Sequence, residues 1–176
     1  MDAINRRGTV LLAGMLLLML LGSSSAGWAE ETNVLVNAQI AGRIVLNILS
    51  GDLVELSADP VDQPHDEGYT EFQVLTNALS YSVIGSFYYV MIGDYDLIAH
   101  SRFTVWSTTE GDGTVISSPT VPPVNMDPSE GITVLAGESG WTGGEVFRVY
   151  YGLDIDFTVP PGTGITPVHF TATMTL

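Results

Sequence analysis

The 176-residue chain contains no cysteine and no lysine. Without cysteine it forms no disulfide and carries out no thiol chemistry, so its own core must hold the fold together. Without lysine, five arginines stand against twenty acidic residues, which gives a formal net charge of −15. Proteins that bind nucleic acid or an anionic membrane cluster Lys and Arg on their surface. The composition therefore argues against nucleic acid as a partner.

Apolar runs long enough to cross a membrane are also missing. The run at 10–21 follows Arg6 and Arg7 and precedes small residues that end at Ala29. A membrane span needs about 20 apolar residues, and this run is shorter. A basic segment followed by an apolar run and then by small residues is the order found in a signal peptide. We expect residues 1–29 to be a cleaved signal peptide. The exported protein then has no integral membrane segment and resides in the periplasm or at the cell surface.

Helical periodicity is absent beyond this leader, and apolar and polar residues alternate along most of the chain. The clearest alternation lies at 149–159 and, after a Pro-Pro-Gly turn, at 168–176. A period of two is typical of strands with one buried face. Further strands are expected at 34–40, 43–49, 69–76, 79–84, 87–92 and 97–107, with 87–92 buried on both faces and loops at 50–68 and 110–131. Short strands separated by turns predict an all-β fold, an antiparallel Greek-key or immunoglobulin-like β-sandwich, as a single domain over residues 30–176.

Two segments carry a resemblance to known proteins. The end of the chain joins two Thr-rich strands through Pro160-Pro161-Gly162-Thr163, and Thr76-Asn77 opens another strand that reaches Val83. Both resemble secreted immunoglobulin-like surface sandwiches, such as fimbrial subunits, spore-coat-type proteins and wall-binding WxL-like domains. The Trp-x-Leu signature of the last group is missing after Trp106 and Trp141. The resemblance implies a structural protein at the cell surface.

Constellations that support catalysis are missing. The stretch 137–140 is one residue short of the Gly-x-Ser-x-Gly elbow of serine hydrolases. The three histidines, His65, His100 and His169, are scattered along the chain. Asp154 and Asp156 share a strand face, but glycosidase carboxylates act within a cleft and these two are expected on an open sheet. We therefore expect no enzymatic activity.

Acidic loops leave calcium as the one ion that the sequence favours, because calcium binds hard oxygen ligands from flexible loops. No EF-hand pattern is present, and no other cofactor is expected. The candidate ligands are Asp59, Asp62, Asp66 and Glu67 in one loop and Asp94 and Asp96 in another, with Glu110 and Asp112 in a third.

Exposed aromatic side chains are a further candidate feature, since they can bind sugars by stacking. In a sheet-rich domain, the alternative is ordinary core or cross-strand packing. The candidates are Tyr88, Tyr89, Tyr95, Trp106, Trp141 and Tyr150.

A non-catalytic surface or structural protein is the function that these observations favour. Residues 34–40 follow the expected cleavage site, and Val34, Val36, Ala38 and Ile40 form one apolar face. Such a segment can pair with the sheet edge of a neighbouring copy, and assembly into a fibre or coat would follow. Its alternative is an ordinary first strand of its own domain. An alternative function is a calcium- or carbohydrate-binding adhesive module, with a cell-surface component as partner.

Overall fold

The computed structural model describes residues 41–124, 130–138 and 142–175, all of them within the compact unit that begins at Ile40. The predicted signal peptide and the predicted assembly strand at 34–40 lie outside the described residues. Within those ranges every regular element is a strand, and no helix that could cross a membrane is present. The strands are β1 (Ile44–Ser50), β2 (His65–Thr76), β3 (Ser80–Phe87), β4 (Met91–Ile92), β5 (Tyr95–Asp96), β6 (Phe103–Thr109), β7 (Thr114–Val115), β8 (Ile132–Gly137), β9 (Thr142–Asp154) and β10 (Val168–Thr175).

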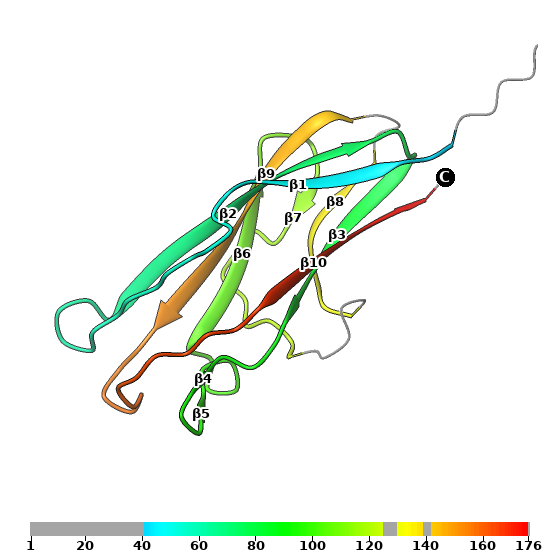
Figure 1. Cartoon of the computed structure of the whole chain (residues 1–176). Coiled ribbons are helices and arrows are strands. Elements are labelled where there is room, and N and C mark those ends of the chain that lie inside the picture. Colours follow the sequence, from blue (N-terminus) through cyan, green and yellow to red (C-terminus); the bar gives the residue numbers. More distant parts are fainter. Residues whose placement is uncertain (1–40, 125–129, 139–141, 176) are drawn as a thin grey trace, which may run out of the picture. The chain divides into compact units, whose positions relative to one another are not determined.

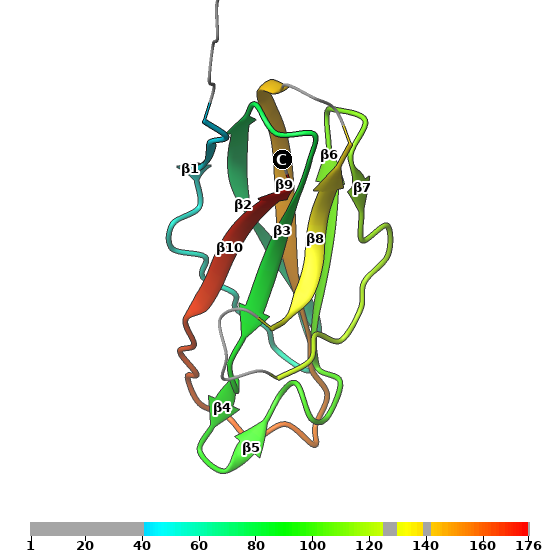
Figure 2. The same ribbon diagram turned by 90° about the vertical axis from the view of Figure 1, so that its right-hand side faces the viewer.

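Two four-stranded antiparallel sheets pack face to face. One has the order β1-β2-β9-β6 and the other the order β10-β3-β8-β7, while β4 and β5 form a separate short hairpin. In Figure 2 the strands β10, β3 and β8 lie in front of β2, β9 and β6, and the β4–β5 hairpin lies at one end. The predicted β-sandwich is therefore confirmed.

The chain crosses repeatedly from one sheet to the other. β2 leads to β3 in the opposite sheet, β8 leads to β9, and β9 leads to β10 (Figure 1). As a result the central neighbours in each sheet are distant in sequence, although β1–β2 and β7–β8 are consecutive: Phe72 of β2 pairs with Phe147 of β9. This connectivity places β1 and β10 as edge strands on one side of the sandwich, where they contact each other.

The core lies between the sheets and is rich in aromatic side chains. Phe72 and Phe147 stack with ring centroids 5.1 Å apart, and Phe170 of β10 packs on Phe72 at 4.6 Å. Val74, Val83, Val105, Val134 and Val149 are completely buried around them. Burial of such side chains stabilises the sandwich by roughly 1.5–3 kcal/mol each. A single continuous core thus replaces the disulfides that the sequence excludes.

Three of the expected strands differ in the structure. The strand expected at 97–107 begins only at Phe103, because residues 97–101 form a turn. The apolar stretch 87–92 is not one buried strand: β3 ends at Phe87, and Tyr89 and Met91 are exposed. The segment 149–159 is a strand only as far as Asp154, because its neighbours β2 and β6 begin at the residues that pair with Asp154 and Leu153. Phe157, which the alternation predicts to be buried, is 81% exposed. Alternation predicted the inward face but not where the partner strands end.

Candidate functional site

The side of the sandwich formed by the edge strands β1 and β10 is incompletely covered. We call it the seam and define it by their core-facing apolar residues, which are half-buried or exposed: Ile44, Leu46 and Ile48 on β1 with Phe170, Ala172 and Met174 on β10. Ile48 is 55% exposed although its partner Phe72 is buried. No strand pairing joins β1 to β10, since they belong to different sheets. The described residues therefore leave apolar surface open along this side.

The opposite side of the sandwich is closed. Its edge strand β6 buries Phe103, Val105 and Ser107 almost completely. The segment after β7 covers the free edge of β6, because Val105 and Thr120 exchange two backbone hydrogen bonds of 2.8 and 2.9 Å. Ser107 also donates from Oγ to the backbone oxygen of Val134 in the facing sheet, at 2.6 Å. The contrast makes the open seam a specific feature and not a general property of edge strands in this fold.

Asn77, in the β2–β3 turn, holds the chain where it enters β1. Its Oδ1 accepts a 2.7 Å hydrogen bond from the Arg43 amide, and its Nδ2 donates to the Ala41 carbonyl at 3.1 Å. The last residue of β10 lies at the same turn, because Thr175 accepts a hydrogen bond from the Leu79 amide. The chain that precedes β1 therefore joins the sandwich at one end of the seam.

A row of aromatic side chains crosses the outer face of the β1-β2-β9-β6 sheet. Trp106 on β6, Tyr150 on β9 and Tyr69 on β2 are direct cross-strand partners. The Trp106 and Tyr150 rings are nearly parallel, with an interplanar angle of 6° and centroids 5.2 Å apart. Tyr69 follows at 5.4 Å from Tyr150, tilted by 48°, and is 44% exposed. We call these three residues the aromatic row.

A second row of polar side chains runs beside the aromatic row. Arg148 on β9 is the direct cross-strand partner of both Thr108 on β6 and Glu71 on β2. Each of the three lies two positions along its strand from a member of the aromatic row. Arg148 donates from Nε to Glu71 at 2.6 Å and lies 5.4 Å from the centroid of the Tyr69 ring. The hydrogen bond to Glu71 raises the pKa of Arg148 above its ordinary value, so the guanidinium stays charged and paired.

The predicted calcium ligands do not gather at one point. Asp59 caps its own turn by accepting hydrogen bonds from the amides of Asp62 and Val61, which lower its pKa. Asp66 accepts a hydrogen bond from the Ser57 amide, and Asp96 accepts one from the Ile98 amide. Among the described residues no group of three or more acidic or histidine side chains is placed to hold a metal ion, including Asp62, Glu67 and Asp94. Calcium binding stays a prediction.

His65 is the histidine with charged partners. Its Nδ1 lies 2.9 Å from Asp154 and its Nε2 lies 3.6 Å from Glu67. The hydrogen bond with Asp154 raises the pKa of His65 above its ordinary value. Half of the imidazole is exposed to solvent, and His65 lies at the first residue of β2, opposite Asp154 at the last residue of β9. We interpret it as a surface ion pair.

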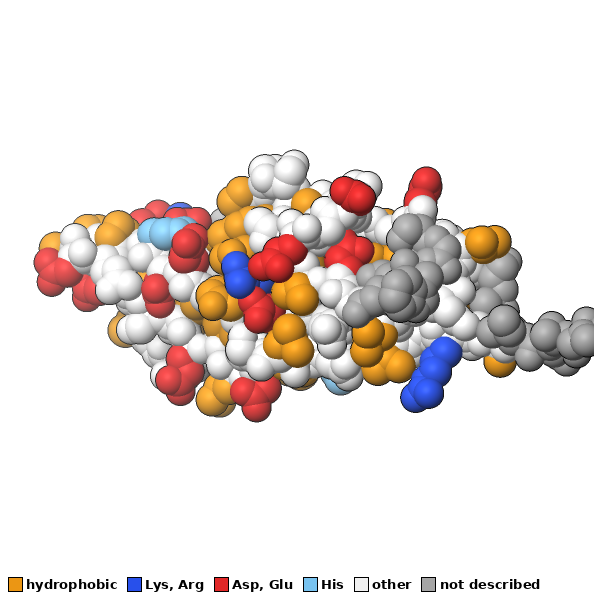
Figure 3. Space-filling view, turned by 90° about the horizontal axis from the view of Figure 1, so that it is seen from above, with side chains coloured by type: hydrophobic (Ala, Val, Ile, Leu, Met, Phe, Trp, Pro, Cys, Tyr) orange, Lys and Arg blue, Asp and Glu red, His pale blue; other side chains and the backbone are white. Residues whose placement is uncertain are grey.

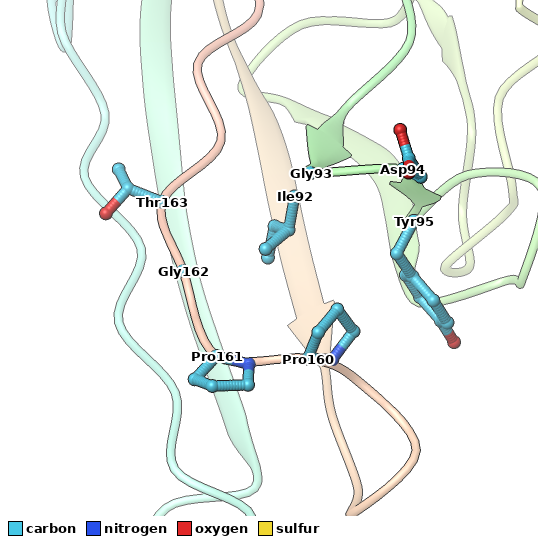
Figure 4. A pocket seen from close by; sticks show the side chains of 8 residues that line it. All are labelled: Ile92, Gly93, Asp94, Tyr95, Pro160, Pro161, Gly162 and Thr163. Carbon is cyan, nitrogen blue, oxygen red and sulfur yellow. The ribbon is translucent and has the colours of Figure 1, made fainter.

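A pocket of about 440 Å³ lies between the β4–β5 hairpin and the turn at 160–163. Its wall is formed by Ile92, Pro160 and Pro161, and Gly162 leaves room for the Ile92 side chain. The polar side chains around it, Asp94, Tyr95 and Thr163, point in different directions (Figure 4). Catalytic sites bring acid, base and nucleophile to a common point. This pocket does not do so.

The sequence alone did not mark Tyr69 of the aromatic row, Asn77 in the β2–β3 turn, or any of the polar row, which is Thr108, Arg148 and Glu71. Sequence analysis named Trp106 and Tyr150 as sugar-stacking candidates, and the structure brings these two together. Tyr88, Tyr89 and Tyr95 lie elsewhere, and Trp141 is outside the described residues. Thr70 and Phe72 are buried, so a period of two places Tyr69 on the outward face of the same strand. Only the strand register, however, places Tyr69 beside Tyr150.

Comparison with protein-family models finds no matching family, and comparison with the curated proteins finds no match.

Proposed function

We propose that this chain is an exported, non-catalytic structural subunit, an immunoglobulin-like surface sandwich that assembles by accepting a strand from a neighbouring copy. The observation that carries the proposal is the open seam between β1 and β10, set against the closed opposite side of the sandwich. Exposed apolar surface at a sheet edge marks a site where another strand adds.

The segment 34–40 is the occupant that fits this seam. In an extended strand its alternation would place Val34, Val36, Ala38 and Ile40 on one face, and β10 faces the core with alternating apolar residues of the same spacing. Exchange of backbone hydrogen bonds gives such pairing its affinity, and the alternate side chains give it specificity.

The place where this segment joins the sandwich favours exchange between copies. Asn77 fixes Ala41 and Arg43 at the end of the seam, in line with β1. A segment that filled the seam of its own chain would have to reverse direction immediately before Ala41. Donation to a second copy requires no such reversal.

Sedimentation of purified protein tests this function. We expect the chain from Glu30 to Leu176 to form large particles and the chain from Ala41 to Leu176, which retains every described strand, to sediment as a compact monomer. Val36→Asp places a charge on the apolar face and should abolish the particles, whereas Asn37→Asp, on the other face of the segment, should leave them intact.

The acceptor side has its own matched pair of variants. Met174 faces the seam and Thr173 faces solvent on the same strand. We expect Met174→Glu to reduce assembly far more than Thr173→Glu, with circular dichroism showing that both variants remain folded. Compact monomers for the chain from Glu30 would refute the proposal.

A further inference from the structure

We propose that the aromatic row binds an uncharged polysaccharide, which stacks its sugar rings on Trp106, Tyr150 and Tyr69. This binding site is separate from the seam: the row lies on the outer face of the sheet and the seam along one side of the sandwich. It goes beyond the structural role proposed above and does not depend on assembly.

The rings are inclined over the sheet. Gly152 lies diagonally from Trp106 on β9, and a Cβ at Gly152 would come within 3.0 Å of the Trp106 indole. The missing side chain therefore lets the indole lie over β9. The Tyr150 ring is parallel to it, and centroids 5.2 Å apart mean that the two rings overlap only in part. Partial overlap leaves area on the ring faces for the C–H groups of a sugar.

The polar row supplies partners for hydroxyl groups beside this stacking surface. Glu71 offers carboxylate acceptors, Arg148 offers guanidinium donors, and Thr108 offers a hydroxyl. All three lie two residues along their strands from the aromatic row, hence on the same face of the sheet. Binding sites for small polar ligands combine apolar and aromatic contact area with a few polar groups that fix orientation.

The charge on and around the two rows favours an uncharged ligand over an anionic one. Arg148 is already paired with Glu71, so the two rows together carry no free positive charge. The protein as a whole has a net charge of −15. On the face seen in Figure 3, hydrophobic side chains lie beside basic and acidic ones near the middle, and further acidic side chains are scattered among uncharged surface. A glycan with carboxylate, sulfate or phosphate groups would be repelled.

The test uses the chain from Glu30 to Leu176 and four polymers: insoluble cellulose, insoluble chitin, soluble hydroxyethylcellulose and, as the anionic case, hyaluronate. We expect retention on at least one uncharged polymer and none on hyaluronate. Trp106→Ala and Tyr150→Ala should each weaken binding by roughly twofold to tenfold, the effect of losing one stacked ring. Tyr69→Phe, which keeps the ring, should bind like the unaltered chain.

Two control variants distinguish binding at the aromatic row from nonspecific adsorption. Tyr89 is 49% exposed and Phe157 is 81% exposed, and neither belongs to the row, so Tyr89→Ala and Phe157→Ala should retain full binding. In a Trp141→Phe background, Trp106 is the only tryptophan after Ala29, and its fluorescence should shift when the bound polymer is added. Failure to bind any uncharged polymer, preference for hyaluronate, or equal losses in the two controls would overturn the inference.

Discussion

The hydroxyl of Tyr81 on β3 donates a hydrogen bond to the carboxylate of Glu145 on β9, so that one side-chain pair joins the two sheets. The other carboxylate oxygen accepts a hydrogen bond from Thr109 at 2.6 Å and one from the Gly113 amide at 3.3 Å. Gly111 and Gly113 lie so close to Glu145 that a Cβ on either would come within 2.7 Å of its carboxyl oxygen. Burial, followed by the contact with Glu145, raises the pKa of the Tyr81 phenol.

We expect Glu145→Ala to destabilise the fold, because it leaves the Tyr81 hydroxyl and the Gly113 amide without their acceptor. An unsatisfied part-buried polar group costs about 1–3 kcal/mol. Chemical denaturation monitored by circular dichroism measures the change in the free energy of unfolding. Glu110→Ala, at an exposed position at the end of β6, is the matched control and should change that free energy by less than about 0.5 kcal/mol. Equal effects for the two variants would contradict a structural role for Glu145.

Replacement of Asn77 should loosen the start of β1 without unfolding the sandwich. Asn77→Ala removes the two side-chain hydrogen bonds to Ala41 and Arg43, and a net hydrogen bond contributes about 0.5–1.5 kcal/mol. Hydrogen exchange should become faster at the Arg43 amide and stay unchanged at core amides such as that of Val149. Asn47→Ala, in the middle of β1, is the control. If Arg43 exchange is unaffected, Asn77 does not hold the chain.

Gly51 and Gly93 provide a matched pair of glycines with positive φ, +73° and +60°. A Cβ at Gly93 meets nothing within 4 Å, so Gly93→Ala adds only backbone strain, about 1–2 kcal/mol. A Cβ at Gly51 would lie 2.3 Å from the Tyr69 carbonyl oxygen, which adds a clash with backbone to the same strain. Gly51→Ala should therefore lower the melting temperature more than Gly93→Ala. The reverse order would contradict this account of the β1–β2 connection.

Protonation of His65 should stabilise the folded state slightly. Its hydrogen bond with Asp154 raises its folded pKa above the unfolded value near 6.5. The stabilisation is therefore fully present below pH 6.5 and is lost as the pH rises through the folded pKa. For an exposed pair it should not exceed about 1 kcal/mol. NMR titration of the imidazole should give a lower pKa in Asp154→Asn than in the unaltered chain, and an unchanged pKa would refute the pairing.

Alternation in the sequence predicted which side chains face the core. Val149, Tyr151 and Phe170 lie on the inner faces as expected, because a period of two reports only which face of a strand is apolar. Strand ends depend on partners: Asp154 ends β9 where β2 and β6 supply no further pairing. Register likewise depends on partners, and no local signal in the sequence pairs Trp106 with Tyr150 or Tyr150 with Tyr69. The aromatic row was therefore beyond prediction as a row, although two of its members were named.

The crossing of the chain between the sheets sets the order in which the protein can fold. β2 and β9 form the longest pairing, yet Phe72 and Phe147 are separated by most of the described chain. β2 and β3 precede their sheet neighbours β9 and β8 in the chain, so a chain that emerges from its N-terminal end exposes them before those neighbours are present. Pairings between distant segments form slowly, because the loop entropy must be lost before the contacts form. The sheet β1-β2-β9-β6 can therefore form only once the chain as far as residue 154 is present, and the other sheet is complete only once β10 has followed.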